Sequence, residues 1–316
     1  MLNVLFMGTP DFAKESLEAI VNSGHNVIGV VTNPDKPKGR GMKMIPPPVK
    51  EFALENNIPV YQPLKVKNNT EFIEEIKRLN PDVICVVAYG KILPKEIIDI
   101  PRLGCINVHG SLLPQYRGAA PIQWSVINGD KQTGITTMYM DIGMDAGDMI
   151  LKETVDIGED ETTGELWERL SKIGGELLVE TLKLIKEGKA PREKQGDDFT
   201  LAPMLDKEMA EIKWNEKAAL EIKNLVRGLN PIMGAYTFIN DKKLKLWKVN
   251  IIGFNEFTNK YNIDTENVEL GKVILANDKQ GLFLKAKDAV IEVIEMQAEG
   301  SKKMNSKDYL RGNKLI

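Results

Sequence analysis

The sequence predicts an α/β protein: a Rossmann-like domain on a mainly parallel sheet, then a small C-terminal β-barrel domain of the oligonucleotide-binding (OB-like) type. Short β-branched runs alternate with helical stretches over the first half of the chain, which is typical of βαβ units. A polar stretch with two prolines, APREKQGDDFTLAPML, interrupts this pattern. Several short strands with turn signals follow it, which favours a barrel or a sandwich. We therefore expect one domain at 1–189, a linker at 190–205 and a second domain at 206–316.

Four apolar runs predict the strands of the first domain. Each run is short and rich in β-branched residues, and the first is closed by the turn signal Gly-Thr-Pro. Periodic patterns between and after the runs predict helices around 46–56, 69–79 and 162–188. The four runs cover residues 2–8, 27–32, 83–88 and 103–109.

The second domain is expected to open with a helix over 206–228 and to continue as a five-stranded sheet. Its candidate strands are short and separated by turn residues, as in a small five-stranded barrel. They cover residues 236–239, 245–249, 271–276, 282–286 and 290–296.

The composition is that of a globular protein and argues against a membrane-spanning chain. Of the 316 residues, 42% are hydrophobic and 28% are charged. No apolar run approaches the roughly 20 residues that cross a bilayer. The N-terminus, MLNVLFMGTP, has neither the basic nor the long apolar region of a signal peptide, so we expect a cytoplasmic protein. Cys85 and Cys105 lie in apolar segments without zinc spacing, which favours core residues and no metal site.

Positive charge is concentrated in three short segments. The formal net charge is −3, yet residues 35–43 carry a local +3, residues 241–248 another +3, and residues 300–316 carry +4. Such runs are often only solvated surface, but three of them in an acidic chain favour local binding of a polyanion. The first segment lies in the connection between the predicted strand at 27–32 and the predicted helix around 46–56. This connection is longer than an ordinary βα connection of about 2–6 residues, and such long loops are typically functional. In it, Lys36, Lys38, Arg40 and Lys43 stand against Asp35.

Two common nucleotide-binding motifs are missing. The turn after the first strand, GTPDFA at 8–13, has one glycine, whereas a dinucleotide-binding turn has three. Those glycines let the backbone approach a pyrophosphate, so the sequence argues against a nicotinamide-dependent dehydrogenase. The P-loop pattern is absent from the sequence as well.

One of the two histidines is a candidate for chemistry. His25 follows Gly24 in a predicted surface turn, where an exposed side chain is the simpler interpretation. His109 ends an apolar strand, at the edge where open α/β sheets bind ligands. Asn107 lies two residues earlier and therefore on the same face of the strand. An amide and an imidazole placed in this way can stabilise an oxyanion and move a proton, although a satisfied core pair is an equally good interpretation of the spacing.

An acidic loop follows at 140–148, with the sequence MDIGMDAGD. Its three aspartates and two glycines are compatible with simple turn chemistry, and Asp141 and Asp148 fit that interpretation well. Asp145 is of more interest, because a carboxylate beside a lone catalytic imidazole would orient the ring. The spacing alone does not place it there.

Several motifs together make the chain similar to a known family. The string NVHGSLLP at 107–114, with YRGAAP at 116–121 and DAGD at 145–148, resembles the folate-dependent formyltransferases. The first string is highly specific for that superfamily, and the basic loop and second domain narrow the resemblance to members that formylate initiator methionyl-tRNA. Met233 departs from the pattern, which usually has a second proline there. The resemblance covers nearly the whole chain, through MGTPDF at 7–12, PKGRG at 37–41, YGKILP at 89–94 and RGLNP at 227–231.

The resemblance implies roles for the matching positions. Asn107 and His109 would stabilise the oxyanion of a tetrahedral intermediate, and Asp145 would orient His109. The co-substrate would be 10-formyltetrahydrofolate, no metal would be needed, and the acceptor would be the amino group of initiator methionyl-tRNA, for translation initiation. Domain 1–189 would be catalytic and domain 206–316 would bind tRNA. The folate is expected against Ser111, Leu112, Leu113 and Pro114.

The basic loop is the expected contact with the tRNA. Arg40 and Lys43 would reach phosphates or base edges of the acceptor arm, Arg40 with the planar fork of donors that lysine lacks. The protein is expected to act as a monomer.

Other functions remain open. A sugar-nucleotide amine formyltransferase and a formyl-folate hydrolase share the fold, but neither explains the basic segments at 35–43 and 300–316. A purine-pathway enzyme that formylates glycinamide ribonucleotide would need only the first domain. A non-catalytic RNA-binding protein built on the second domain would leave the pair Asn107 and His109 without a purpose.

Overall fold

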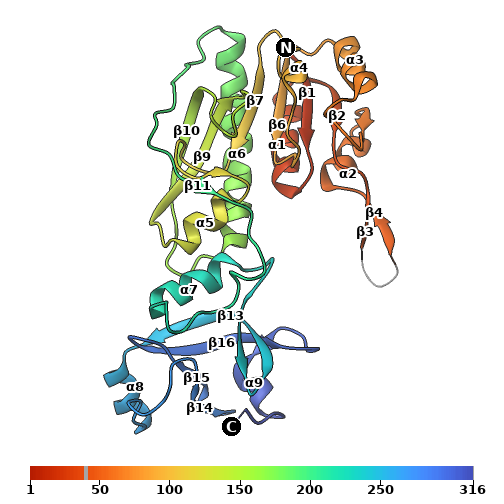
Figure 1. The fold of residues 1–316 in the computed structure, drawn as a ribbon. Helices are drawn as coiled ribbons and strands as arrows, with labels where there is room; N and C mark the ends of the chain where they lie inside the picture. Colours follow the sequence, from red (N-terminus) through yellow and green to blue (C-terminus); the bar gives the residue numbers. More distant parts are fainter. Residues whose placement is uncertain (39–41, 316) are drawn as a thin grey trace. The chain divides into compact units, whose positions relative to one another are not determined.

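The chain forms two compact units that share the sequence between them in alternating pieces (Figure 1). The computed structural model describes residues 1–38 and 42–315. The first unit comprises Met1–Ile122, Gln132–Asp156 and Trp167–Pro203. The second unit takes Met204–Ile316 together with two short pieces of the earlier chain, Gln123–Lys131 and Ile157–Leu166. The sequence predicts a single division, which places both short pieces in the first domain.

A seven-stranded sheet is the centre of the first unit, with the strand order β10-β9-β7-β6-β1-β2-β5. The five strands from β7 to β5 are parallel, whereas β9 is antiparallel to both β7 and β10. The predicted, mainly parallel sheet is therefore confirmed. Strands β9 and β10 were not predicted, because their threonines, glycine and charged residues do not form an apolar run. The strands are β1 (Asn3–Gly8), β2 (Asn26–Val31), β5 (Val60–Tyr61), β6 (Val83–Val87), β7 (Cys105–His109), β9 (Gln132–Tyr139) and β10 (Met149–Asp156).

Three helices lie where the sequence periodicity predicts them. In α3, the side chain of Asn69 caps the amino end by accepting a hydrogen bond from the Phe72 N–H at 3.1 Å, and Asn80 ends the helix in the left-handed conformation. The predicted helices around 46–56, 69–79 and 162–188 are all confirmed. The helices up to this point in the chain are α1 (Asp11–Asn22), α2 (Pro48–Glu55), α3 (Thr70–Leu79), α4 (Lys95–Ile98), α5 (Pro121–Ile127) and α6 (Thr163–Lys186).

Helix α6 packs on one face of the sheet. A Cβ at Gly174 would lie 3.1 Å from Cγ1 of Val108, so the helix backbone approaches β7 closely. Because side chains alternate along a strand, Asn107 and His109 face away from α6. Strand β7 therefore presents these two polar side chains to the opposite face of the sheet.

The stretch expected to be a free linker packs on the first unit. Glu193 and Met149 exchange backbone hydrogen bonds of 2.8 and 3.0 Å. Further along, β11 (Leu201–Ala202) pairs in parallel with β8 (Arg117–Gly118). A polar composition with two prolines concealed this pairing, because the bonds involve the backbone and leave no periodic trace in the sequence.

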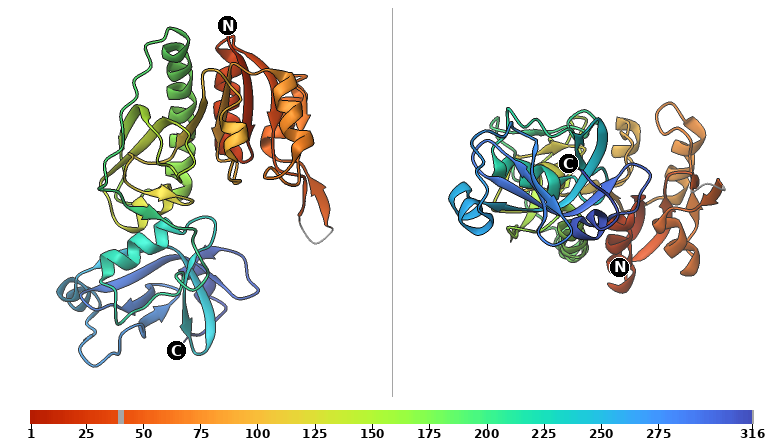
Figure 2. Two further views of the ribbon diagram at one scale, coloured as in Figure 1. Left: turned by 45° about the horizontal axis from the view of Figure 1, so that its top comes forward. Right: turned by 90° about the horizontal axis from the view of Figure 1, so that it is seen from below.

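Strands β3 (Lys36–Lys38) and β4 (Lys43–Ile45), which include parts of the basic segment at 35–43, pair antiparallel as a β-hairpin that extends from the sheet (Figure 2). A polar network holds its base. The ammonium group of Lys50 lies 2.8 Å from Asp35 Oδ1 and 2.9 Å from Gln62 Oε1, and the Gln62 amide donates to Asp35 Oδ1 at 2.8 Å. The hydrogen bonds from Gln62 and Lys50 hold the pKa of the Asp35 carboxyl below its ordinary value. The sequence predicts only a long loop here, and the hairpin was not expected.

The second unit is an antiparallel sheet with the order β12-β13-β16-β15-β14, and β17 pairs with β16. The five predicted strands are confirmed. The helix predicted over 206–228 is confirmed only at its end. Residues 206–218 are turns and irregular chain instead, and in them the N–H of Ile212 donates to the Tyr236 carbonyl of β12 at 2.8 Å. The elements are α7 (Ala219–Gly228), β12 (Ala235–Ile239), β13 (Lys242–Ile252), α8 (Phe254–Tyr261), β14 (Val273–Asn277), β15 (Gly281–Lys285), β16 (Val290–Ala298), β17 (Met304–Asn305) and α9 (Ser306–Leu310).

A buried arginine explains why an early piece of chain belongs to the second unit. Nη1 of Arg227 donates to the carbonyl oxygens of Gly158 and Glu161, both at 3.1 Å, and Nε donates to Asn224 Oδ1 at 2.9 Å. The hydroxyl of Thr163 adds a 2.8 Å bond to the Gly228 carbonyl. Burial removes water from the guanidinium of Arg227 and lowers its pKa. The carbonyl oxygens of Gly158 and Glu161 accept its hydrogen bonds in place of that water.

Across the described parts of the chain, no helix is both long and apolar enough to span a membrane.

Candidate active site

Strand β7 places two of the predicted catalytic residues side by side on one face. His109 is buried and Asn107 is half-buried, on the face that points away from α6. Their backbones are aligned by β9, where Asn107 is opposite Met138 and His109 is opposite Thr136. The juxtaposition expected from the i, i+2 spacing is therefore present.

The third predicted residue, Asp145, reaches the same place from a distant part of the chain. Its Oδ2 accepts a hydrogen bond from the Gly118 N–H at 2.9 Å and lies 3.7 Å from His109 Nδ1. Its Oδ1 accepts a longer bond, of 3.4 Å, from the amide nitrogen of Asn107. The structure thus brings Asn107, His109 and Asp145 together around one carboxylate, which the sequence could not show.

The two ring nitrogens of His109 have different surroundings. Nε2 lies 2.8 Å from the backbone carbonyl oxygen of Tyr116. A carbonyl can only accept, so Nε2 carries a hydrogen in this arrangement. Nδ1 faces the Asp145 carboxylate at a distance too long for a full hydrogen bond. Nδ1 and the second hydrogen of the Asn107 amide therefore both retain capacity for a further partner.

The predicted folate-binding segment has a mixed orientation. The hydroxyl of Ser111 is buried and donates to the Gln115 carbonyl at 2.6 Å, and the side chain of Leu113 is buried as well. Leu112 and Pro114 are half-buried. The hydroxyl of Thr136 holds the backbone of residues 111–113 in place, because it donates to the Ser111 carbonyl at 2.7 Å and accepts from the Leu113 N–H at 3.1 Å. Within this segment, Leu112 and Pro114 thus keep side-chain surface for a ligand.

The other two aspartates of the loop have local roles, in line with their simpler interpretation. Asp141 is exposed and accepts a 2.7 Å hydrogen bond from the N–H of Ile142. Asp148 lies 3.6 Å from a guanidinium nitrogen of Arg192, whose guanidinium carbon in turn lies 3.7 Å from the ring centroid of Tyr139. Both carboxylates are thus engaged within their own surroundings, apart from the cluster around His109.

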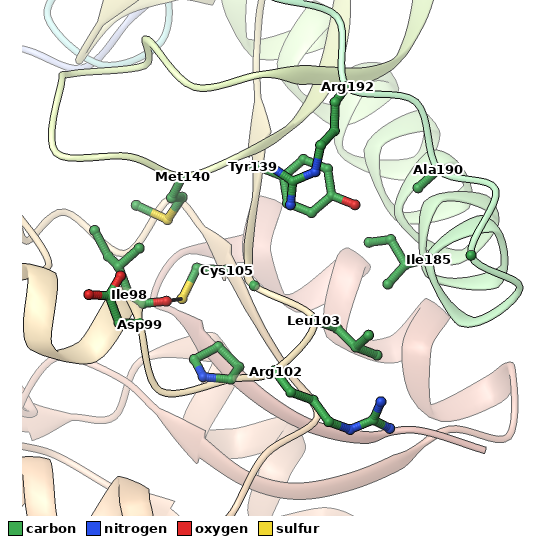
Figure 3. A pocket seen from close by; sticks show the side chains of 13 residues that line it. Ile98, Asp99, Arg102, Leu103, Cys105, Tyr139, Met140, Ile185, Ala190 and Arg192 are labelled. Atoms are coloured by element: carbon green, nitrogen blue, oxygen red, sulfur yellow. Dashed lines mark hydrogen bonds between the residues drawn. The ribbon is translucent and has the colours of Figure 1, made fainter.

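A separate hollow of about 490 Å³ lies at the other end of β7 (Figure 3). Arg192 and Tyr139 line it, together with Leu103 and Cys105 at the start of the strand. Burial raises the pKa of Tyr139, against the opposing effect of Arg192. The hollow contains none of the three predicted catalytic residues, so we place the chemistry at the His109 end on the basis of donor and acceptor geometry.

Among residues 1–38 and 42–315, no group of three or more histidine, cysteine or acidic side chains could hold a metal ion.

Several groups that shape the site were not predicted from the sequence. The N–H of Gly118 and the carbonyl of Tyr116 are backbone atoms, which residue types do not reveal. Gln195 was missed because it lies in the polar stretch taken for a linker. It donates to the backbone carbonyls of both Asp145 and Gly147.

Two family models together match most of the chain, and individual relatives match nearly all of it. The model described as formyl transferase matches residues 2–182, and the model of the formyl transferase C-terminal domain matches residues 204–314. A protein named methionyl-tRNA formyltransferase from Ruminiclostridium cellulolyticum is 50% identical over 99% of this chain and 97% of its own length. Relatives of the same name from Clostridioides difficile, at 50% identity, and Caldanaerobacter subterraneus subsp. tengcongensis, at 49%, are covered to 98% of their lengths and cover 99% of this chain.

Solved structures share the fold at low sequence identity. A sugar 3N-formyl transferase, WlaRD, has a TM-score of 0.65 at 19% identity, over 96% of this chain and 99% of its own. HypX from Aquifex aeolicus, solved with tetrahydrofolic acid, has a TM-score of 0.63 at 15% identity, over 98% of this chain and 47% of its own. The two family models and the near-full-length relatives show that the chain belongs to the formyl transferase family, with both its N-terminal and its C-terminal domain.

Proposed function

We propose that the protein transfers the formyl group of 10-formyltetrahydrofolate to the free amino group of initiator methionyl-tRNA, giving formylmethionyl-tRNA for translation initiation. The observation that carries the chemistry is the cluster of Asn107, His109 and Asp145, in which the imidazole Nδ1 and the amide nitrogen both lie beside the Asp145 carboxylate. The acceptor is supported by relatives of that name at about 50% identity over nearly the whole chain. The proposal includes a monomeric enzyme of the cytoplasm.

The proposed reaction exchanges one C–N bond for another. The neutral amine of the aminoacyl group attacks the formyl carbon and creates a tetrahedral intermediate with a negatively charged oxygen. The Asn107 amide donates a hydrogen bond to this oxygen, and His109 donates a second one through Nδ1 when both ring nitrogens carry a proton. When the intermediate collapses, the bond from the carbon to the folate nitrogen breaks, and that nitrogen gains a proton while the attacking amine loses one. His109 is suited to carry this proton, because it is the one imidazole in the cluster.

Asp145 has two functions in this proposal. Its negative charge favours a proton on the neighbouring Nδ1 of His109 during proton transfer. Its other oxygen accepts from the Asn107 amide, which orients that amide so that its second N–H is available to the substrate oxygen. The Gly118 N–H anchors the carboxylate at 2.9 Å.

We assign tRNA binding to two basic surfaces. In the first unit, Lys43 is exposed on the β3–β4 hairpin. Arg40, the other residue expected to contact tRNA, lies outside the described residues, and its role remains a proposal from the sequence. The positive charge of the hairpin suits the phosphates of an RNA acceptor.

The second basic surface is a hollow of about 390 Å³ in the second unit. Three of its lining residues are lysines, Lys207, Lys243 and Lys245, and the Lys243 ammonium lies 3.5 Å from the ring centroid of Tyr236. Cationic and aromatic groups together suit the phosphates and bases of RNA. We therefore propose that residues 1–189 form the catalytic domain, 190–205 the connection, and 206–316 the tRNA-binding domain.

The basic segment at 300–316 is expected to contribute less to tRNA binding than these two surfaces. Lys303 lies 2.6 Å from Glu295, and Arg311 lies 3.1 Å from Asp308, so part of its charge is already neutralised within the protein. Its share of tRNA binding is expected to be diffuse and strongly salt-dependent.

The acceptor is tested by one assay with two competing amines. With 10-formyltetrahydrofolate as donor, the purified protein is expected to formylate methionyl-tRNA and to leave a nucleotide-linked amino sugar unreacted. The readout is the formylated product of each acceptor by mass spectrometry. Transfer to the sugar, or release of formate without an acceptor, would assign the protein to another member of the family.

The catalytic cluster is tested by substitution within that assay. Asn107→Ala and His109→Ala are each expected to lower kcat by about 10²-fold or more, because each removes one donor to the oxyanion. Asp145→Asn keeps the size of the side chain but loses its charge, and a similar fall is expected. Asp141→Asn is the matched control, since Asp141 is an exposed residue of the same loop. A folded His109→Ala or Asn107→Ala protein with the parent's turnover would remove the oxyanion role.

The basic surfaces are tested by single lysine substitutions. Lys43→Ala and Lys243→Ala are each expected to reduce kcat/KM for methionyl-tRNA at low salt, with an unchanged KM for the folate. Each should also make the plot of log kcat/KM against log salt shallower, by about 0.7–0.9 for every phosphate that the variant no longer neutralises. Lys279→Ala, in an exposed turn between β14 and β15, is the control. If both variants match this control at every salt concentration, the two surfaces do not bind the tRNA.

A further inference from the structure

Gln195 uses its whole side-chain amide to join two loops of the first unit. Its Nε2 donates to the backbone carbonyl of Asp145 at 2.7 Å and to that of Gly147 at 2.8 Å. Its Oε1 accepts from Nε of Arg117 at 2.9 Å. Both amide hydrogens and the oxygen are therefore occupied, which is an unusual commitment for a half-buried glutamine between exposed neighbours.

The loop at 141–148, to which Gln195 donates both hydrogen bonds, contains neither a helix nor a strand. Asp145 has φ of +49°, a backbone conformation that a residue with a side chain keeps only where its surroundings fix it. Gly147 is buried, and a Cβ there would overlap the carbonyl oxygen of Tyr139, so this end of the loop lies directly on β9. The two bonds from Gln195 hold the loop on both sides of the single residue between Asp145 and Gly147.

Arg117, which donates to Oε1 of Gln195, belongs to the segment that supports His109. The guanidinium of Arg117 stacks on the ring of Phe199 at 4.3 Å, and the Arg117 N–H donates to the Thr200 carbonyl at 2.9 Å. The hydroxyl of Thr200 accepts from the N–H of Tyr116 at 2.8 Å. The carbonyl of Tyr116 is in turn the partner of His109 Nε2. Residues 195–200 thus contact both the loop that carries Asp145 and the loop that supports His109.

We propose that Gln195 is a positioning residue that sets the carboxylate of Asp145 against His109 and Asn107, an inference that rests on the proposed formyl transfer. The bonds of Gln195 reach the backbone of Asp145 rather than the side chains of the cluster, so it acts through that backbone. The Asp145 carboxylate lies 3.4 and 3.7 Å from its two side-chain partners, distances at which a small shift of the loop separates them.

Two substitutions separate the halves of the amide. Gln195→Met keeps the length of the side chain and removes every hydrogen bond. Gln195→Glu keeps an acceptor for Arg117 but places an oxygen, without hydrogens, against the carbonyls of Asp145 and Gly147. Both are expected to lower kcat by about 10- to 100-fold with KM for either substrate changed by less than about twofold. Gln132→Met is the control, because the Gln132 amide also makes a 2.8 Å bond, to Asp156, away from the site.

A double-mutant cycle distinguishes positioning from a general loss of structure. If Gln195 acts through Asp145, then Gln195→Met should lower kcat little further in a protein that already carries Asp145→Asn. A purely structural role would give independent, multiplying losses in the double variant. Multiplying losses, or parent-like kcat in Gln195→Met and Gln195→Glu, would overturn the proposal.

A measurement without turnover separates this inference from the proposed function. Amide hydrogen exchange of residues 141–148 is expected to be faster in Gln195→Met than in the parent and in Gln132→Met. Parent protein that does not formylate methionyl-tRNA would overturn the proposed function, whatever the exchange result. Active parent protein with unchanged exchange in Gln195→Met would overturn the positioning role alone.

Discussion

The carboxylate of Asp145 is the point on which the proposed site depends. Three groups from strand β7 and the β8 segment approach it: the Gly118 N–H and the Asn107 amide donate to it at 2.9 and 3.4 Å, and Nδ1 of His109 lies 3.7 Å away. A carboxylate with two oxygens can receive all three, whereas an amide or hydroxyl in its place would have to turn a donor toward one of them. The loop of Asp145, the β8 segment and strand β7 therefore have to be placed together for any of the three contacts to form.

Much of the fold follows from patterns in the sequence, because buried parallel strands are apolar along their whole length. Strands β1, β2, β6 and β7 were predicted in this way, and so were the helices α2, α3 and α6. Strands β9 and β10 escaped, since β9 buries threonines: Thr137 pairs with Thr181 at 2.8 Å, and Thr136 supports the turn after His109. The hydrophilic composition of β9 hides core positions whose hydroxyl groups find partners far away in sequence.

The candidate site was predictable where it depends on spacing and hidden where it depends on tertiary structure. Asn107 and His109 share a face because side chains alternate along a strand, so two residues and one rule suffice. Asp145 could be joined to them only by resemblance, since 36 residues separate it from His109 and its contact arises from a left-handed turn. The contacts of the stretch at 190–205 were hidden for a related reason: its bonds to Met149, Asp145 and Arg117 use backbone atoms or a single amide, which leave no pattern of residue types.

The proposed function divides between a partly buried site and charged surfaces. Within the cluster around Asp145, His109 is buried and Asn107 and Asp145 are half-buried, so their dipoles are screened less than at the surface and affect a developing charge more strongly. Lys43 of the hairpin and Lys207 of the second unit are exposed, so the effect of their charge is long-ranged and weakened by salt. An overall charge of −3 is compatible with a polyanionic partner, because the positive charge is gathered in short segments.

The oxyanion role of the cluster is tested most directly by a crystal structure of the protein with an unreactive formyl-folate. The formyl oxygen is expected to lie about 2.7–3.1 Å from the Asn107 amide nitrogen and from a ring nitrogen of His109, with Asp145 still against both side chains. A formyl group bound at another part of the first unit, or an oxygen directed away from both donors, would contradict this role.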